Sequence, residues 1–183
     1  RGYVQPFAEV RNYTGNGETD NLTRLRLRRL RFRLTGDAAK QKIDYRFQID
    51  LSGSSEVGDG PSSFLLDAWV RYSLTKRIRV TFGQKATPTD NRELTMGSQT
   101  LQLVERSRLT SAFSSIREFG FFIDGNFKTG GGTYVRPSIA ITNGDGLNVN
   151  GRDFGGLKYG GRIDFLPFGV FTNFGEFRQA DMV

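Results

Sequence analysis

Hydrophobic and polar residues alternate without a break along the segment Lys42–Gly53. The apolar positions are all odd-numbered, and they are Ile43, Tyr45, Phe47, Ile49 and Leu51. A period of two predicts a β-strand with one apolar and one polar face. At about 3.3 Å per residue and a tilt of about 45°, such a strand rises about 25 Å, the height of the apolar band of an outer-membrane barrel. Its length therefore suits a strand that crosses a membrane.

The same alternation recurs along most of the chain. The further patterned segments are Phe64–Leu74, Arg77–Lys85, Arg117–Phe127, Thr133–Thr142 and Gly156–Phe165. Together with Gly2–Tyr13, the weakly patterned Val170–Phe177 and an arginine-rich segment, they predict about eight or nine strands. The fold class expected is all-β, a transmembrane antiparallel β-barrel formed by residues 1–183 as one incomplete domain.

Individual side chains within these segments can be assigned to a face. In Phe64–Leu74, the pattern places Leu66 and Val70 on the apolar face and Trp69 on the polar face. Phe122 interrupts the polar face of its segment. Pro137 is an objection to its strand, because proline cannot donate a hydrogen bond to a central ladder.

Connections between the segments alternate in length. Short ones lie near Thr75–Lys76, Lys128–Gly132 and Leu166–Gly169, and long ones cover Ser52–Ser63, Ala86–Ser115 and Asn143–Gly155. Transmembrane barrels show this alternation, with turns on the periplasmic side and loops outside. The segment Ala86–Ser115 is long for a plain connector, and loops of that length are more often functional.

Six arginines and five apolar residues alternate between Leu22 and Thr35, but the two halves of the segment are out of phase across Arg28–Arg29. A one-residue bulge at that point would restore the phase. It would place all six on the polar face as a ladder with a step of about 6.6 Å on either side of the bulge. The ladder consists of Arg24, Arg26, Arg28, Arg29, Arg31 and Arg33.

Composition narrows the chemistry that the chain can perform. It contains no Cys and no His, which removes disulfides, thiolate or imidazole metal sites and Ser–His or Cys–His catalysis. No apolar run approaches the roughly 20 residues of a transmembrane helix. The net charge of +7 and the pI near 10 favour anionic partners. No cofactor is expected, and the chain is not expected to be an enzyme.

Other polar-face positions are also basic, including Arg46, Arg71, Arg79 and Lys85. An excess of fixed positive charge along a narrow aqueous path attracts anions and repels cations. Two alternatives remain open: the ladder neutralises acids on the same face, or the segment is a solvated face of a soluble sheet. Nucleic acid is disfavoured, because the aromatic residues lie on the face opposite the arginines and could not stack on the same ligand.

These residues resemble the phosphate-selective porin O and P family of outer-membrane barrels. The resemblance covers roughly residues 20 to 170 and rests on the order and spacing of several short pieces: Arg28-Arg29-Leu30-Arg31 with Gly36, Tyr45 with Phe47-Gln48-Ile49-Asp50, Leu66-Asp67-Ala68-Trp69-Val70, Phe82-Gly83-Gln84-Lys85 with Pro88, Glu105-Arg106-Ser107, Ala112-Phe113, Arg117-Glu118-Phe119-Gly120 and Asn143-Gly144-Asp145-Gly146.

The resemblance implies a barrel of about 16 to 18 strands in the outer membrane of a diderm bacterium, often trimeric, that passes phosphate-like anions. It implies that Ala86–Ser115 is an infolded constriction loop, and that Arg28, Arg29, Arg31 and Lys85 carry the family's basic motif. The strand count is too small for such a pore. We therefore expect the N-terminal half of a porin, the alternative being a small eight-stranded barrel with a filled interior.

The function expected is passive, anion-preferring diffusion through an arginine-lined lumen of a multi-pass outer-membrane protein. The expected partners are small anions such as phosphate, the lipid bilayer, and copies of the chain in a homotrimer or a larger envelope complex, with no nucleic acid. The alternative is a non-catalytic barrel that is a structural or docking component of an envelope complex.

Overall fold

A computed structural model describes residues 1–15, 18–53, 64–89, 117–146 and 155–169. Within these ranges the chain forms strands and turns, and no helix is long and apolar enough to cross a bilayer. The strands are β1 (Gly2–Gly15), β2 (Glu18–Ala38), β3 (Ile43–Asp50), β4 (Leu65–Ser73), β5 (Ile78–Ala86), β6 (Arg117–Gly125), β7 (Phe127–Gly130), β8 (Thr133–Thr142) and β9 (Lys158–Leu166).

All nine described strands belong to one antiparallel sheet, and from β1 to β6 each strand pairs with the next one in sequence. The order is β1-β2-β3-β4-β5-β6-β8, with β7 and β9 also paired to β8. β6 and β7 follow one path along β8 and are separated at Asn126. The predicted all-β, antiparallel architecture is confirmed, whereas the predicted strand Val170–Phe177 lies outside the described residues.

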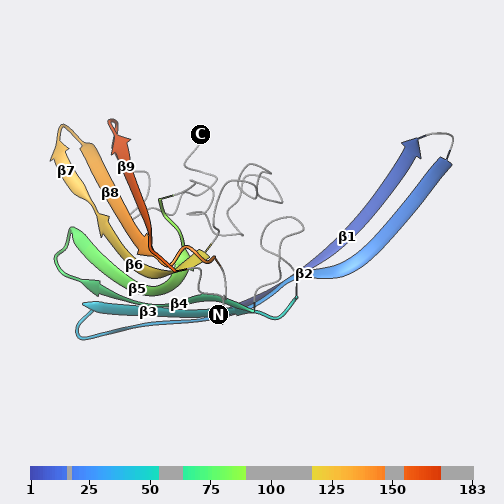
Figure 1. The fold of residues 1–183 in the computed structure, drawn as a ribbon, viewed down its shortest axis with the longest axis horizontal. Helices are drawn as coiled ribbons and strands as arrows, with labels where there is room; N and C mark the ends of the chain where they lie inside the picture. The colour runs from blue at the N-terminus through green and yellow to red at the C-terminus, as the bar shows by residue number, and fades with distance from the viewer. Residues whose placement is uncertain (16–17, 54–63, 90–116, 147–154, 170–183) are drawn as a thin grey trace.

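The sheet is strongly curved. Figure 1 shows β3 and β4 along the floor of a trough whose side rises through β6, β8 and β9. Among the described residues, β1 is paired with β2 and β9 with β8, so the sheet is not closed into a ring. This is the geometry of a stretch of barrel wall.

The two faces of the sheet differ as the alternation predicts. Outward-facing apolar side chains keep much of their surface exposed, for example 52% at Val70, 52% at Phe121 and 48% at Ile139. On this face the ring centroids of Phe82 and Phe121 are 4.5 Å apart. Polar side chains of the opposite face are largely buried, and some contacts there skip a strand, as between Arg117 of β6 and Asp67 of β4. Contacts of that kind belong to the concave side.

Leu66 is a correction to the predicted faces. Its side chain is fully buried instead of facing outward, because the β3–β4 register shifts there: Gln48 pairs with Asp67, and Ile49 pairs with Leu65. Leu66 is the extra residue of a bulge, so Leu65 takes the outward position opposite Ile49. Leu65 and Leu66 are both apolar, so the hydrophobic pattern could not show where the register shifts.

Pro137 proves compatible with β8. The β6–β8 register ends at the pair Asp124 and Ser138, and the β7–β8 register begins at the pair Phe127 and Val135. Pro137 therefore lies beside the interruption at Asn126, where the ladder requires no donor from its nitrogen.

Two glycines bring four strands, β4, β5, β6 and β8, close together. Gly83 of β5 pairs with Gly120 of β6, and a Cβ at either would lie 2.7 Å from a backbone Cα of the next strand, that of Trp69 or Thr142. Gly83 also has a φ of 124°, which side chains rarely tolerate. Both positions therefore require glycine.

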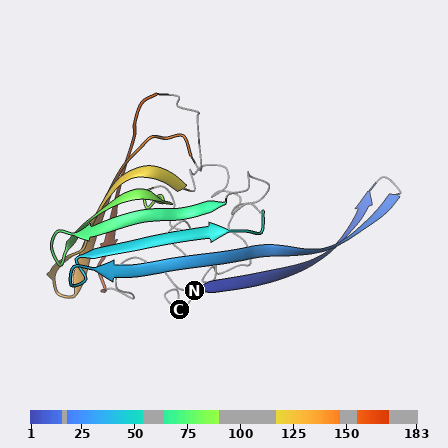
Figure 2. The ribbon, with the colours of Figure 1, turned by 90° about the horizontal axis from the view of Figure 1, so that it is seen from below.

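The β1–β2 hairpin is much longer than its neighbours. β2 has 21 residues, of which Arg31–Ala38 pair with β3. The remainder forms a two-stranded ribbon with β1 that extends beyond the ends of β3 and β4 (Figure 2). The ribbon lies on the side of the sheet where the long connections begin, because the short turn between β2 and β3 lies at the other end.

Candidate functional site

The bulge predicted in the arginine segment is present. Gln5 of β1 pairs with Arg29, whereas the next residue, Pro6, pairs with Leu27, which leaves Arg28 as the extra residue of β2. Pro6 has no N–H to donate, so the register changes where β1 cannot supply a ladder bond. This proline was the sequence signal that could have located the bulge independently.

All six ladder arginines lie on the polar side, but their surroundings differ. At the bulge, Arg28, Arg29 and Arg31 are 4%, 0% and 4% exposed. Arg33 is partly buried, opposite Gln48 of β3. Arg24 and Arg26 are exposed on the two-stranded ribbon, where the Arg26 guanidinium lies 5.0 Å from the centre of the Phe7 ring.

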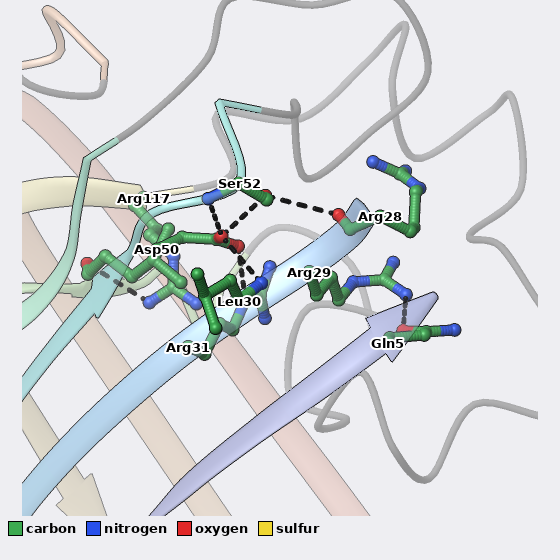
Figure 3. Close-up of polar contacts among 9 residues, drawn as sticks. Gln5, Arg28, Arg29, Leu30, Arg31, Asp50, Ser52 and Arg117 are labelled. Atoms are coloured by element: carbon green, nitrogen blue, oxygen red, sulfur yellow. Dashed lines mark hydrogen bonds and ion pairs between the residues drawn. The ribbon is translucent and has the colours of Figure 1, made fainter. Parts of the chain in front are cut away.

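Asp50 holds the bulge from the neighbouring strand (Figure 3). Its carboxylate accepts hydrogen bonds from Arg31 Nε at 2.6 Å, from Ser52 Oγ at 2.6 Å and N at 3.0 Å, and from Leu30 N at 3.3 Å. Ser52 Oγ also donates to the Arg28 carbonyl at 3.3 Å. The end of β3 is therefore tied to the backbone on both sides of Arg29.

The three guanidinium groups diverge from the bulge. Figure 3 shows the Arg29 side chain directed at Gln5, the Arg31 side chain directed at Asp50, and the Arg28 side chain directed away from both. Arg29 donates to Gln5 Oε1 at 2.7 Å. Three adjacent cations are thereby spread over an area of the concave face.

The middle of the polar face carries ordered base–acid pairs. Asp67 of β4 binds Arg117 of β6 and lies 3.7 Å from Arg46 NH1 of β3. Arg71 donates to Asp44 Oδ2 from Nε at 3.1 Å and from NH2 at 3.0 Å. These contacts join three strands across the concave surface.

The Lys85 side chain lies against the neighbouring strand, β6. Its ammonium lies 4.9 Å above the Phe122 ring and 3.6 Å from Asp124 Oδ2, the acid that stands opposite Arg79. Phe122, which interrupted the polar pattern, is fully buried on this face. The aromatic ring therefore supports a cation within the polar surface.

The alternative that the ladder neutralises acids on the same face is met at one position, Asp50. Among the described residues, six acids of the polar face each have a basic partner, and the ladder provides that of Asp50 through Arg31. Bases of other strands bind the remaining five, in the pairs Arg71–Asp44, Arg117–Asp67, Lys158–Glu118, Lys85–Asp124 and Arg162–Asp164.

Three contributors escaped the sequence analysis. Arg117 has the same parity as the outward phenylalanines of β6, yet it is 7% exposed and binds Asp67. Gln5 and Ser52 lie far from the ladder in sequence, and only the register brings them to it. Trp69 lies close to two bases of the polar face: its ring centre is 5.2 Å from Arg46 Cζ and 5.0 Å from Arg71 Cζ.

The long connection after β5 begins on the concave side. Thr87 is 1% exposed, and a Cβ at Gly160 of β9 would lie 2.5 Å from Thr89 Oγ1. β5 and β9 are separated in the sheet by β6 and β8. Residues 90–115 of the predicted constriction loop lie outside the described residues.

Comparison with known proteins identifies the family. The family model described as phosphate-selective porin O and P matches residues 3–170. A search of curated proteins gives no match. The match covers β2 to β9 in full and all of β1 except Gly2, and the observed sheet has one apolar and one polar face, as a porin wall requires. The chain is therefore a member of the phosphate-selective porin O and P family, whose proteins are channels of the outer membrane.

Proposed function

We propose that the concave polar face is the lumen wall of a passive, anion-preferring pore and that the arginine ladder lies on the anion path. The observation that carries this proposal is the bulge at Arg28, which brings Arg28, Arg29 and Arg31 together on one face. The path then continues past Arg46, Arg71, Arg79 and Lys85 on the neighbouring strands. Phosphate-like anions are the solutes that the family description favours.

Electrostatics favours anions along this wall. Acids are present, but on the strands of the polar face bases outnumber them. A cation approaching such a wall is repelled, whereas an anion meets guanidinium N–H donors at successive levels. Several shallow sites suit conduction better than one deep site, because an ion must also leave.

We further propose that 86–115 narrows the lumen. Its first residues support this, because Thr87 is buried and Thr89 contacts β9 across two intervening strands. A chain that starts across the concave face is placed to restrict the passage of solutes.

The remaining assignments follow from the family. We propose a multi-pass location in the outer membrane of a diderm bacterium and assembly as a homotrimer. Chemical cross-linking of the detergent-purified protein, read by mass, tests the trimer: a monomer alone would refute it.

The ladder is tested by charge removal at the bulge. The triple variant Arg28→Gln, Arg29→Gln, Arg31→Gln is compared with the original protein in planar bilayers under a KCl gradient. The reversal potential should shift toward the K⁺ equilibrium potential. An unchanged reversal potential would remove the ladder from the anion path.

A matched control separates local from overall charge. The variant Lys40→Gln, Lys42→Gln, Lys76→Gln removes the same charge from exposed positions in two short turns. It should leave the reversal potential close to that of the original protein. Equal shifts in both triple variants would mean that net charge, and not the bulge, determines selectivity.

A further inference from the structure

The end of β5 bends over the concave face of the sheet. Lys85 pairs with Glu118 of β6, but its ammonium lies 3.6 Å from Asp124 Oδ2 and 4.9 Å from the centre of the Phe122 ring. Glu118 and Asp124 are six residues apart, which is about 20 Å along a straight strand. A lysine side chain is too short to span that distance. The paired strands β5 and β6 must therefore bend between the two positions.

A pair of glycines permits this bend. Gly83 precedes Lys85 by two residues, has a φ of 124° and pairs with Gly120 of β6. Glycine inside a strand often marks the tight bend at which a barrel wall turns a corner. Figure 1 shows that β5 is strongly curved. The glycine pair therefore directs the residues that follow Gly83 back over the sheet.

Thr89 gives independent evidence of the same reversal. One row of the polar face consists of residues that pair in succession from β5 to β9: Thr81, Phe122, Ala140 and Gly160. Thr81 lies five residues before the end of β5 at Ala86, so a straight continuation would lead away from this row. Instead, a Cβ at Gly160 would lie 2.5 Å from Thr89 Oγ1 and 3.1 Å from Thr89 Cβ.

Both contacts fall on the same row of the wall. Lys85 lies over Phe122, and Thr89 meets Gly160 two strands farther along. Phe122 and Ala140 are almost fully buried although they belong to the concave face. The segment 85–89, here called the crossing segment, therefore runs across the concave side from β5 to β9.

We propose that the crossing segment is a fixed constriction of the lumen at the level of this row, and that Gly160 is the positioning residue that holds it there. Any Cβ at position 160 would overlap the Thr89 side chain, so glycine provides the space in which Thr89 sits. The constriction carries a base, because Lys85 and Arg79 both lie beside the single acid Asp124. This inference rests on the proposed anion path and gives the level at which the path is narrowest.

An engineered disulfide tests the position of the crossing segment, because this chain contains no cysteine. The 3.1 Å between Thr89 Cβ and a Cβ at position 160 is near the separation of about 3.5–4.5 Å across a disulfide. The full-length variant Thr89→Cys, Gly160→Cys should lose both thiols on oxidation with copper phenanthroline. Its single-channel conductance in planar bilayers should be the same before and after oxidation, because the crossing segment is already in place.

The neighbouring glycine provides the matched control. Gly161 pairs with the outward-facing Ile139, and a Cβ there meets nothing within 4 Å. Thr89→Cys, Gly161→Cys should therefore retain both thiols under the same oxidation. Failure of the Thr89→Cys, Gly160→Cys variant to oxidise would overturn the proposal, as would a conductance that changes when its disulfide forms.

Reciprocal changes of side-chain size test the effect on the pore. Gly160→Val should push Thr89 off the wall toward the pore axis and lower single-channel conductance. In the background Thr89→Gly, the same substitution should lower conductance much less, because the space that valine needs is vacant. An equal fall in both backgrounds would attribute the effect to the volume of valine itself and overturn the proposal. Gly160→Ala replaces Gly160→Val if the latter does not insert.

The outcomes separate this inference from the proposed function. Heat-modifiable migration on gels verifies that each variant is folded. If the original protein shows no anion preference, the proposed function fails, and the oxidation experiment still determines whether Thr89 lies against position 160. If the anion preference is present and the cysteine pair does not oxidise, only the constriction at Gly160 fails.

Discussion

Replacing Leu34 by arginine is expected to destabilise the folded protein by about 2–4 kcal/mol, the cost of a basic side chain on the lipid face near the bilayer midplane. Leu34 is 50% exposed on the apolar face, opposite Phe47. It lies four residues before the end of β2 at Ala38. That distance is about 13 Å along the strand, or about 9 Å along the normal at a tilt of about 45°.

The adjacent residue provides the matched control. Thr35 is exposed on the polar face, opposite Arg46. Thr35→Arg introduces the same side chain one residue away and should cost about 0.2–1 kcal/mol, from repulsion between like charges across the strand pair.

Equilibrium unfolding by guanidinium chloride of the protein folded in phosphatidylcholine vesicles, followed by circular dichroism, measures both free energies. Leu34→Arg should lower the free energy of unfolding several times more than Thr35→Arg. Equal losses, or a larger loss at Thr35, would refute the assignment of the apolar face to lipid and with it the orientation of the whole sheet.

Asp50→Asn should cost about 2–3 kcal/mol of unfolding free energy, because it removes the charge-assisted bond to buried Arg31; a loss below 0.5 kcal/mol, roughly the scatter of such measurements, would contradict that role. Gly120→Ala should cost about 1–3 kcal/mol through backbone overlap, whereas Gly161→Ala, where a Cβ meets nothing within 4 Å, should be nearly neutral in the same unfolding assay. Deleting about ten residues within 86–115 should raise single-channel conductance if this segment narrows the lumen; an unchanged conductance would place it elsewhere.

Most of the fold could be predicted because the alternation has a physical cause. A wall between lipid and water needs opposite polarity on successive residues, so Lys42–Gly53 and the segments like it reveal both the strand and its faces. The same reasoning located the bulge at Arg28, since two arginines in succession break the phase visibly. Leu65 and Leu66 have the same polarity, so a shift of register there leaves no trace in the pattern.

The site was less predictable because its contacts depend on register. Arg31 meets Asp50, and Trp69 meets Arg46, only once β2, β3 and β4 are aligned. Parity also fails at the beginning of a strand, where Arg117 turns to the polar side. Residue types identified the basic face, and strand pairing determined which bases bind acids.

The length of the β1–β2 hairpin divides the six arginines into two classes. Those at the bulge are held by three strands, while Arg24 and Arg26 lie where only β1 accompanies β2. A two-stranded ribbon has little support of its own. On the proposed function, Arg24 and Arg26 affect the rate at which anions reach the pore, and salt screens this effect. The arginines at the bulge affect which ion the pore retains. Substitutions at the two ends of β2 could therefore change the rate of anion capture and the selectivity between ions independently.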